Sequence, residues 1–313
     1  MAMPEVIRPM LAELAPSPFD SPRHLFEPKW DGLRALAFIT PGDTWLQSRR
    51  LRRWRRTFPE VIAALRALVS GDSAILDGEL IVPDASGRPD FEAAVARARM
   101  GEPAARRAAS ERPAVYVVFD LLYLDGEDLR GSPLRIRRER LHARALHWPQ
   151  EGTVLLCPGA VGPGRALFES ALGLGLEGAM AKELDSPYLE GRRSRCWLKF
   201  KPFAEEAMWV VGYVPAEPGG IRALAVASPP GRLAGLVGTG LSAAEQRRLR
   251  ASLACLARSS PPPDLALPSP AARLPREAAG IVWTQPVRQV RVRYLERTSA
   301  GWLRHASVVS LLP

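Results

Sequence analysis

The chain has 313 residues, enough for two domains that each have a core. Its hydrophobic fraction of 47% is ordinary for a globular protein, and no apolar run approaches the roughly 18 residues that span a membrane. The N-terminus has no basic region followed by an apolar run, so we expect a cytoplasmic protein, and the net charge of +10 indicates a polyanionic partner.

The first two thirds of the chain predict a mixture of strands and helices. Residues 1–26, rich in proline and small side chains, predict an extended lead-in, and the turn at Asp31-Gly32 precedes a strand over 33–39. Apolar residues at helical spacing, with Pro59 in the first turn, predict a helix over 57–69. Further along we expect strands over 74–82 and 115–124, a helix over 163–174 and the beginning of a strand in 177–182.

After Pro202 the pattern changes to short strands separated by Gly and Pro. Ser242 and Glu245 form a capping-box pair ahead of a helix that should end near Arg258, and a proline-rich loop covers 259–275. The strands are expected over 208–214, 223–228, 233–238, 281–283 and 287–295. Several short strands around one helix are typical of a small OB-type barrel, so we expect a domain boundary near residue 203.

Cysteine and histidine residues are scattered. The three cysteines form no C-x-x-C pair, and the four histidines are far apart. This spacing argues against a disulfide framework and gives no support to a zinc ribbon or a histidine metal cage.

Positive charge is concentrated in two arginine clusters. The first surrounds Trp54 and consists of Arg49, Arg50, Arg52, Arg53, Arg55 and Arg56. The second consists of Arg130, Arg135, Arg137, Arg138 and Arg140. Such clusters bind phosphate in nucleic-acid-binding proteins, although each also fits a solvated face without a ligand.

Lysine is rare in this arginine-rich chain. Of 43 basic residues, four are lysines: Lys29, Lys182, Lys199 and Lys201. Arginine stays protonated and cannot act as a nitrogen nucleophile, whereas lysine can lose its proton and attack. The four lysines are therefore candidates for chemistry, with chance retention as the alternative.

One segment places a lysine just before a tight turn and an arginine five residues after it: Glu27-Pro28-Lys29-Trp30-Asp31-Gly32-Leu33-Arg34. Alone, a K-x-D-G-x-R string is only moderately specific and also fits a surface turn. It is followed in order by Ser48-Arg49-Arg50, Asp77-Gly78-Glu79-Leu80, Phe119-Asp120-Leu121-Leu122, Glu177-Gly178-Ala179-Met180-Ala181-Lys182 and Trp197-Leu198-Lys199-Phe200-Lys201. In the last of these segments the two lysines share one strand face, and the residues between and before them share the other.

In this order the segments resemble the nucleotidyltransferase motifs of the covalent ligase and mRNA-capping superfamily. The flanking sequence narrows the resemblance to ATP-dependent DNA ligases, especially the ligase domain of bacterial end-joining ligase D and its stand-alone relatives. Four further segments support this resemblance: residues 117–126, 191–201, 235–240 and 294–305. The resemblance covers about residues 8–306. It implies an α+β fold, with an N-terminal nucleotidyltransferase (adenylation) domain of antiparallel sheets and flanking helices over 1–202 and a C-terminal OB-fold barrel over 203–313.

The resemblance implies the chemistry of Lys29. Its amine would attack the α-phosphate of ATP, release pyrophosphate and keep AMP as a phosphoramidate. AMP would then pass to the 5′-phosphate of a DNA nick, where the 3′-hydroxyl displaces it. Arg34, Lys199 and Lys201 would hold the phosphate, and their charges would favour the neutral amine that attacks.

The remaining roles also follow from the resemblance. Glu27 would recognise the adenine edge, and Phe119 would stack on the base. Two carboxylates match the ribose and metal positions of the family, Glu79 and Glu177, and such oxygen ligands suit Mg²⁺ or Mn²⁺. Nucleotide and phosphate contacts are expected from Arg34, Arg49 and Arg193.

Structural alternatives stay open for some of these residues. Phe119 also fits ordinary core packing, and Lys182 fits a structural salt bridge. Asp31 and Asp77 are expected to be hydrogen-bonding residues of a turn and a strand end rather than catalysts.

Two departures from the family pattern lead to further expectations. Family members usually continue past residues 303–305 into a short Arg-x-Asp-Lys element that contacts pyrophosphate during self-adenylation. That element is missing here, so we expect lysine adenylation to be weak relative to the later steps. The extra N-terminal DNA-binding domain of larger ligases is also missing, so DNA binding should depend on the basic clusters and be strongly salt-dependent.

The expected partner is nicked duplex DNA, bound by a monomer associated with the bacterial nucleoid. DNA repair or end joining is the expected process, and the resemblance makes a Ku-like end-binding protein or a polymerase a plausible protein partner. Two alternatives stay open: an RNA ligase or capping-type nucleotidyltransferase, and a non-catalytic nucleic-acid-binding protein descended from a ligase.

Overall fold

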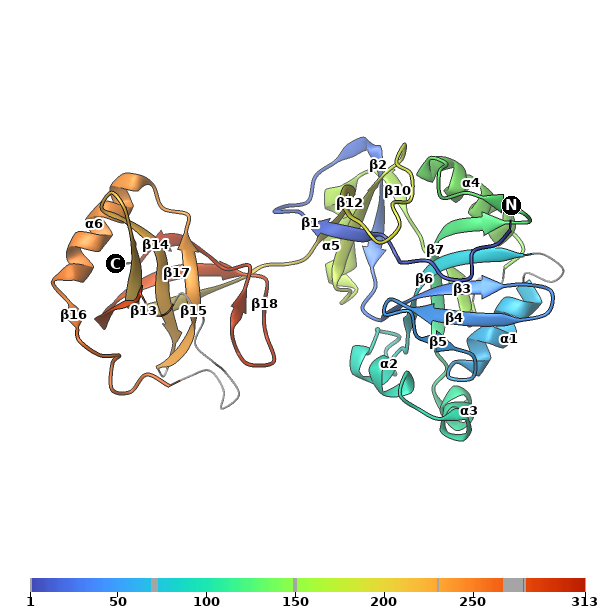
Figure 1. The fold of residues 1–313 in the computed structure, drawn as a ribbon, viewed down its shortest axis with the longest axis horizontal. Helices are drawn as coiled ribbons and strands as arrows, with labels where there is room; N and C mark the ends of the chain where they lie inside the picture. Colours follow the sequence, from blue (N-terminus) through green and yellow to red (C-terminus); the bar gives the residue numbers. More distant parts are fainter. Residues whose placement is uncertain are drawn as a thin grey trace. The chain divides into compact units, whose positions relative to one another are not determined.

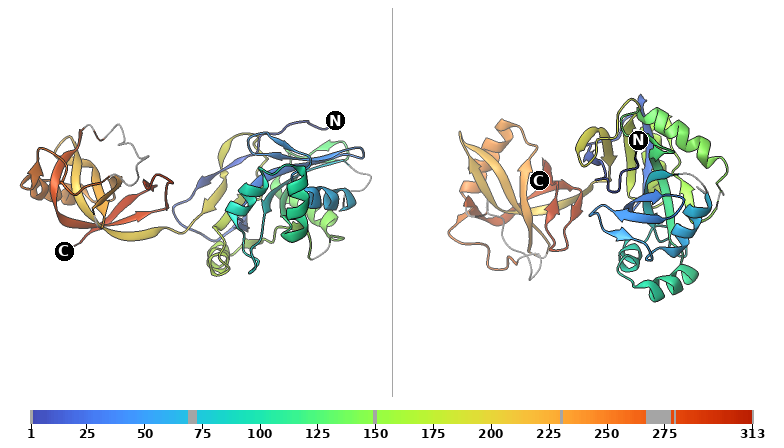
Figure 2. Two further views of the ribbon diagram at one scale, coloured as in Figure 1. Left: turned by 90° about the horizontal axis from the view of Figure 1, so that it is seen from below. Right: turned by 45° about the vertical axis from the view of Figure 1, so that its right-hand side comes forward.

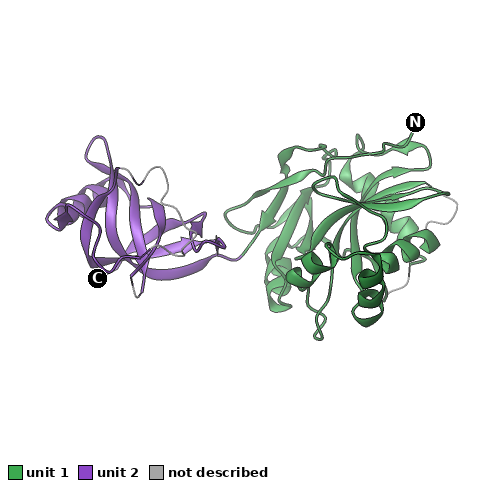
Figure 3. Cartoon of the chain, turned by 60° about the horizontal axis from the view of Figure 1, so that its bottom comes forward, with its two compact units in different colours: residues 1–201 green, residues 202–313 purple. Residues whose placement is uncertain are grey.

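The computed structural model describes residues 2–68, 73–148, 151–229, 231–266, 278 and 280–312. The chain divides between Lys201 and Pro202 into two compact units, residues 1–201 (unit 1) and 202–313 (unit 2), coloured separately in Figure 3. Each unit has its own sheets and its own hydrophobic core. No helix among the described residues is both long and apolar enough to cross a membrane.

The first sheet of unit 1 has five strands (Figure 1). Their order is β1 (Leu11–Leu14), β12 (Arg193–Phe200), β11 (Gly178–Glu183), β2 (Ser21–Lys29) and β10 (Ala160–Gly162). One face of this sheet packs against α5 (Gly164–Gly173) through a small core that includes Phe26, Ala181 and Phe200. Because side chains alternate along a strand, Glu27, Lys182 and Trp197 point to the opposite face.

The second sheet of unit 1 has seven strands. Its main path is β5 (Arg53–Trp54), β4 (Thr44–Ser48), β3 (Leu33–Ile39), β6 (Ala74–Ile81), β7 (Val115–Leu124) and β8 (Glu127–Asp128), and β9 (Val154–Leu156) pairs with β7. The helices of this part of the chain are α1 (Pro59–Leu68), α2 (Phe91–Arg97), α3 (Glu102–Glu111) and α4 (Leu134–Ala145). The largest core of the unit packs Leu65 of α1 and Leu141 of α4 against one face of the sheet.

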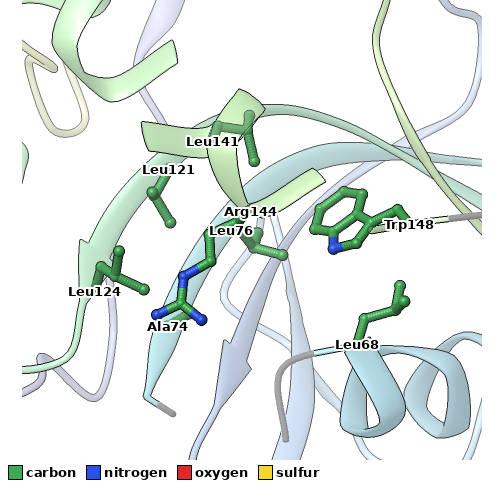
Figure 4. Close-up of a pocket in the computed structure, with 8 residues that line it drawn as sticks. All are labelled: Leu68, Ala74, Leu76, Leu121, Leu124, Leu141, Arg144 and Trp148. Atoms are coloured by element: carbon green, nitrogen blue, oxygen red, sulfur yellow. The ribbon is translucent and has the colours of Figure 1, made fainter. Parts of the chain in front are cut away.

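The two sheets of unit 1 pack face to face through a second core that contains Leu36 and Phe38 from β3 and Trp197 from β12. Glu27, Lys29, Arg34, Glu79 and Lys199 lie on these two inner faces. A small cavity lies elsewhere, between α1, α4 and the outer face of the second sheet (Figure 4). Apart from Arg144, its lining is apolar, which indicates a packing defect of the large core rather than a ligand site.

Unit 2 is a closed barrel, seen from two further sides in Figure 2. Its strands are β13 (Ala204–Ala216), β14 (Gly220–Ser228), β15 (Arg232–Thr239), β20 (Ser307–Leu311), β17 (Val282–Tyr294) and β16 (Ala257–Arg258). The barrel closes because β13 pairs with both β14 and β17. Helix α6 (Ala243–Ala254) contributes Leu249 and Leu253 to the barrel core, and β18 (Glu296–Arg297) and β19 (Leu303–Arg304) form a separate hairpin.

The locally encoded elements match the sequence predictions. The strands over 33–39 and 115–124 are confirmed residue for residue, and the predicted helices over 57–69 and 163–174 correspond to α1 and α5. The strands predicted over 74–82, 208–214, 223–228 and 233–238 correspond to β6, β13, β14 and β15. The capping box is also confirmed, because Ser242 and Glu245 bond to each other's backbone amides.

Three predictions were wrong in extent. The lead-in over 1–26 contains β1 and most of β2, which pair with strands more than 130 residues away along the chain. The helix after Ser242 ends at Ala254, and Arg258 lies in β16. The two strands predicted over 281–283 and 287–295 are one strand, β17, whose register against β13 shifts where Pro286 lacks a donor. The predicted loop over 259–275 lies partly outside the described residues.

Candidate active site

Lys29 is the last residue of β2 and leads into the tight turn at Asp31 and Gly32. This turn carries the chain from the first sheet of unit 1 to the second. It passes so close to β6 that a Cβ atom on residue 32 would lie 2.3 Å from the carbonyl oxygen of Leu80, so glycine is needed there. The Asp-Gly pair therefore leaves Lys29 at the end of the first sheet, beside the second.

Glu177 lies between two lysines. Gly178 is the register partner of Lys29 across the β2–β11 pair, which brings Glu177 beside Lys29. The Lys29 Nζ donates to one carboxylate oxygen of Glu177, and the Lys201 ammonium pairs with the other. Burial favours the neutral carboxyl, but the two lysines together outweigh it and hold the pKa of Glu177 below its usual value.

Lys199 lies on the same sheet face as Lys29. Glu27, Met180 and Lys199 are register partners in a row across β2, β11 and β12. The residues on either side of Lys199 pack toward α5 on the other face, which confirms the predicted alternation. Burial lowers the pKa of Lys199, and neighbouring cations, Lys201 foremost, lower it further. Lys29, Lys199 and Lys201 thus form a concentrated positive field around Glu177.

Arg34 projects from β3 and is held by a buried aspartate. Its Nε and Nη2 donate to Asp77 at 3.0 and 2.6 Å, and its Nη1 donates to the carbonyl oxygen of Met10 at 2.6 Å. Burial works against the cation, but Asp77 outweighs it and raises the pKa of Arg34. The Tyr188 hydroxyl also donates to Asp77, at 2.7 Å. Asp77 therefore acts as a hydrogen-bonding residue, as expected from sequence, but it lies inside β6 and not at a strand end. Most of the Arg34 donors are already engaged.

Glu79 is the register partner of Arg34 across the β3–β6 pair, on the face toward the first sheet. Burial raises the pKa of Glu79 to about 8, although Lys29 and Arg34 act in the opposite direction. No described residue forms a hydrogen bond or an ion pair with its carboxyl group. A partly buried carboxylate without a partner, beside a lysine, is suited to a cation that arrives with phosphate.

Of the two carboxylates expected to bind a metal ion, Glu79 fits that role better than Glu177. Both oxygens of Glu177 are engaged by lysines, whereas those of Glu79 are not. No group of three His, Cys, Asp or Glu side chains that could hold a metal occurs among the described residues. A divalent cation here would therefore need phosphate oxygens as additional ligands.

Glu27 is fully buried and pairs with two cations. The Lys182 Nζ lies 2.5 Å from one carboxylate oxygen, and the Arg138 Nη1 lies 3.2 Å from the other. Lys182 also lies 4.0 Å from the ring centroid of Phe119 and 4.4 Å from that of Trp197. Phe119 is half-buried and meets Trp197 edge to face, so base stacking would use the part of its ring that stays exposed.

Two of the predicted arginine contacts lie apart from this group. Arg193 begins β12, is exposed, and donates to the carbonyl oxygen of Ala12. Arg49 lies in the exposed turn after β4 and makes no hydrogen bond or ion pair with any described residue. Neither arginine bonds to the lysines or carboxylates above within the described part of the chain.

The second basic cluster does not form a free phosphate-binding face. Each of its five arginines is ion-paired within the chain, and Arg137 and Arg138 are buried. The pairs are Arg130–Asp128, Arg130–Glu190, Arg135–Asp185, Arg137–Asp120, Arg138–Glu27 and Arg140–Glu127. Sequence reasoning missed Arg138 because its contacts lie on β2 and β7, far away in the chain. Lys182 was singled out by the rarity of lysine and by its place in the segment 177–182, but its contact with Glu27 was not foreseen.

The sequence and the fold agree with known proteins over both units. Residues 9–201 match the family model of the ATP dependent DNA ligase domain, and residues 220–312 match that of the ATP dependent DNA ligase C terminal region. The chain therefore belongs to the ATP-dependent DNA ligases. This confirms the expected fold class, an α+β nucleotidyltransferase domain followed by an OB-fold.

Within this family the chain is similar to ligase D proteins. It is 37% identical over 97% of its length to the multifunctional non-homologous end joining protein LigD of Pseudomonas aeruginosa, and 35% identical over 92% to LigD of Mycobacterium tuberculosis. It spans only 35% and 36% of those two proteins. Among solved structures, mycobacterial DNA ligase D complexed with ATP and MES is 33% identical with a TM-score of 0.56, covering 98% of this chain and 95% of that one.

The solved ligase domain from M. tuberculosis LigD gives the same result, at 32% identity and a TM-score of 0.57 over 98% of this chain and 95% of that one. A Lig E DNA ligase shares the fold at 19% identity and a TM-score of 0.52. The matches to LigD thus cover both units of this chain and nearly all of the solved ligase domain.

Proposed function

We propose that this chain seals nicks in duplex DNA through a covalent lysyl-AMP intermediate on Lys29. The observation that carries the proposal is the contact of the Lys29 amine with Glu177, inside a field made by Lys199 and Lys201. Membership of the ATP-dependent DNA ligases supports ATP as the AMP donor. On this reading residues 1–201 form the adenylation domain and residues 202–313 the OB-fold domain.

In the first step the Lys29 Nζ forms a bond to the α-phosphorus of ATP, and the bond from that phosphorus to pyrophosphate breaks. The ammonium must first lose a proton, and the Glu177 carboxylate is the acceptor already in contact with it. Lys199 and Lys201 stabilise the charge that develops on the phosphate oxygens.

A divalent cation, Mg²⁺ or Mn²⁺, would be held by Glu79 and the phosphates and would neutralise phosphate charge when bound. For Glu177 to act as a second ligand, Lys29 and Lys201 must first turn toward the nucleotide.

The base-binding role falls to Glu27 and Phe119. Glu27 lies two residues before Lys29 on the same strand face, about 7 Å along the strand. That spacing suits a nucleoside whose base meets Glu27 while its α-phosphate meets Lys29. The half-buried ring of Phe119, on the facing sheet, supports stacking on the base.

The similarity to LigD proteins supports a role in DNA repair or end joining. A nicked duplex as substrate implies association with the bacterial nucleoid. A Ku-like end-binding protein or a polymerase is the protein partner that fits such a process, with the chain itself acting as a monomer.

The direct test replaces the nucleophile. Lys29→Arg keeps a positive charge but cannot form the phosphoramidate, so adenylyl transfer from ATP should fall by at least roughly 10³-fold. Intact-protein mass spectrometry should find one AMP adduct on the wild type, located on the peptide containing Lys29, and none on the variant. Labelling of the variant to the wild-type extent would contradict the proposal.

A pre-adenylated nick provides the control for this variant. Because AMP is already attached to the DNA, sealing no longer needs Lys29 as a nucleophile. Lys29→Arg should therefore still seal this substrate while failing on an ordinary nick. Failure on both substrates together with a lowered melting temperature would indicate misfolding, and a Lys29→Ala variant would then replace it.

A further inference from the structure

Arg138 on α4 joins the two residues proposed to bind the base. It is buried, with 5% of its surface exposed. Its Nη1 lies 3.2 Å from Glu27 Oε1 and donates to the carbonyl oxygen of Phe119 at 3.1 Å. Its Nη2 donates to the carbonyl oxygen of Cys157 at 3.0 Å. One guanidinium thus connects β2 of the first sheet with β7 of the second and with the segment after β9.

The contacts of Arg138 and Lys182 leave one buried oxygen of Glu27 without a hydrogen bond from any described residue. Glu27 Oε1 is buried and accepts no hydrogen bond from any described residue, although it lies beside the guanidinium. Lys182 approaches the other oxygen from within the first sheet. Two cations therefore hold the carboxylate in one orientation while one oxygen keeps its hydrogen-bonding capacity. A buried acceptor that is fixed but unsatisfied is suited to a donor on a ligand.

From this geometry we propose that Arg138 is a positioning residue for adenine, which sets the Glu27 carboxylate and the Phe119 backbone so that the chain selects ATP over GTP. The inference rests on the proposed adenylation of Lys29. A fixed carboxylate oxygen accepts a hydrogen bond from the 6-amino group of adenine. The 6-carbonyl oxygen of guanine at the same place is itself an acceptor and is repelled.

Arg137 provides a matched control on the same helix. It is also buried, and it forms a two-point ion pair with Asp120 of β7, at 2.8 and 2.9 Å. It donates to backbone carbonyl oxygens as well, those of Ser132 and Ser186. Arg137 thus anchors α4 to the second sheet without touching Glu27 or Phe119 in any hydrogen bond or ion pair among the described residues. Substitution of either arginine should loosen α4 to a similar extent, whereas only substitution of Arg138 should act through Glu27.

The experiment compares Arg138→Lys with Arg137→Lys and the wild type in the lysine-adenylation reaction. Each protein is given ATP, GTP and purine riboside triphosphate, which is ATP without the 6-amino group. We expect Arg138→Lys to raise the KM for ATP about tenfold, equivalent to about 1.4 kcal/mol. The KM for purine riboside triphosphate should change little, so the ratio of the two KM values should collapse in this variant alone. ATP-over-GTP selectivity should fall in parallel.

The ratio of KM values within one protein is independent of how much of that protein is folded, so a loss of stability cannot imitate the expected result. If the effects on KM of replacing Arg138 and of removing the 6-amino group are additive in free energy, Arg138 does not act through the base, and the inference is wrong. An equal collapse of the ratio in Arg137→Lys also overturns it. A wild type that forms no lysyl-AMP would instead overturn the proposed function and, with it, this inference.

Discussion

At the scale of single residues, the fully buried charged side chains described in unit 1 lie in pairs or larger groups. Asp77 holds Arg34, Asp120 holds Arg137, and Glu27 lies between two cations. Such pairs gain little net stability over apolar residues, but removal of one partner leaves an uncompensated buried charge. These pairs therefore indicate where the interior geometry is fixed, and two of them lie next to the proposed nucleotide pocket.

Replacement of Asp77 tests this argument. Asp77→Asn keeps the side-chain shape but leaves Arg34 without a counter-charge and weakens the acceptor for Tyr188. We expect the free energy of unfolding of unit 1 to fall by about 3–5 kcal/mol. Urea denaturation followed by tryptophan fluorescence measures this. Asp43→Asn, which alters the exposed pair with Arg55, should change stability by less than about 1 kcal/mol, and equal losses in both variants would contradict the argument.

At the scale of elements, the structure separates local from long-range determinants. Helix α6 begins where Ser242 and Glu245 satisfy each other's backbone donors, so its start is encoded within four residues. Strands β1 and β2 have no comparable local signal. They form because β12 and β11, encoded near residues 178–200, supply their hydrogen-bonding partners. Their prolines and small residues hid them in the sequence.

The capping box of α6 gives a prediction at this scale. Ser242→Ala removes the side-chain acceptor for the Glu245 amide and should destabilise the helix start by about 1 kcal/mol. Hydrogen exchange followed by mass spectrometry should show faster exchange in the first turn of α6. Ser259→Ala, at an exposed position without a hydrogen bond to any described residue, should leave exchange unchanged. Unaltered exchange in Ser242→Ala would show that packing of Leu249 and Leu253 alone fixes the helix.

At the scale of the whole molecule, the net charge is +10, but the arginines differ in whether they are paired with acidic residues of the chain. The arginines of α4 and its surroundings are neutralised by ion pairs within the chain. In the first cluster, by contrast, Arg49, Arg50 and Arg52 are exposed and form no ion pair with any described residue. Of the two arginine clusters, the first therefore offers unpaired charge to a polyanion, in the turn between β4 and β5.

This distribution predicts which charges release counterions from DNA. The double variant Arg49→Gln, Arg50→Gln should reduce the slope of log affinity for nicked duplex against log salt by about 2. The matched double variant Arg135→Gln, Arg140→Gln removes the same formal charge from paired positions and should change the slope by much less. Fluorescence anisotropy across a salt series measures both. Equal slope changes would mean that the paired arginines exchange their partners for phosphate.

The sequence by itself determined the family, the motif order, the strand after the Asp-Gly turn and the helices with local start signals, because these depend on residues close together in the chain. It also pointed to the rare lysines, three of which meet around Glu177. Only the tertiary structure decided that Arg34 is engaged by Asp77, that Glu27 is enclosed by Lys182 and Arg138, and that the arginines of the second cluster are ion-paired within the chain. These outcomes depend on burial and on partners far away in sequence, and a charged residue's spacing does not reveal whether water or a counter-charge will solvate it.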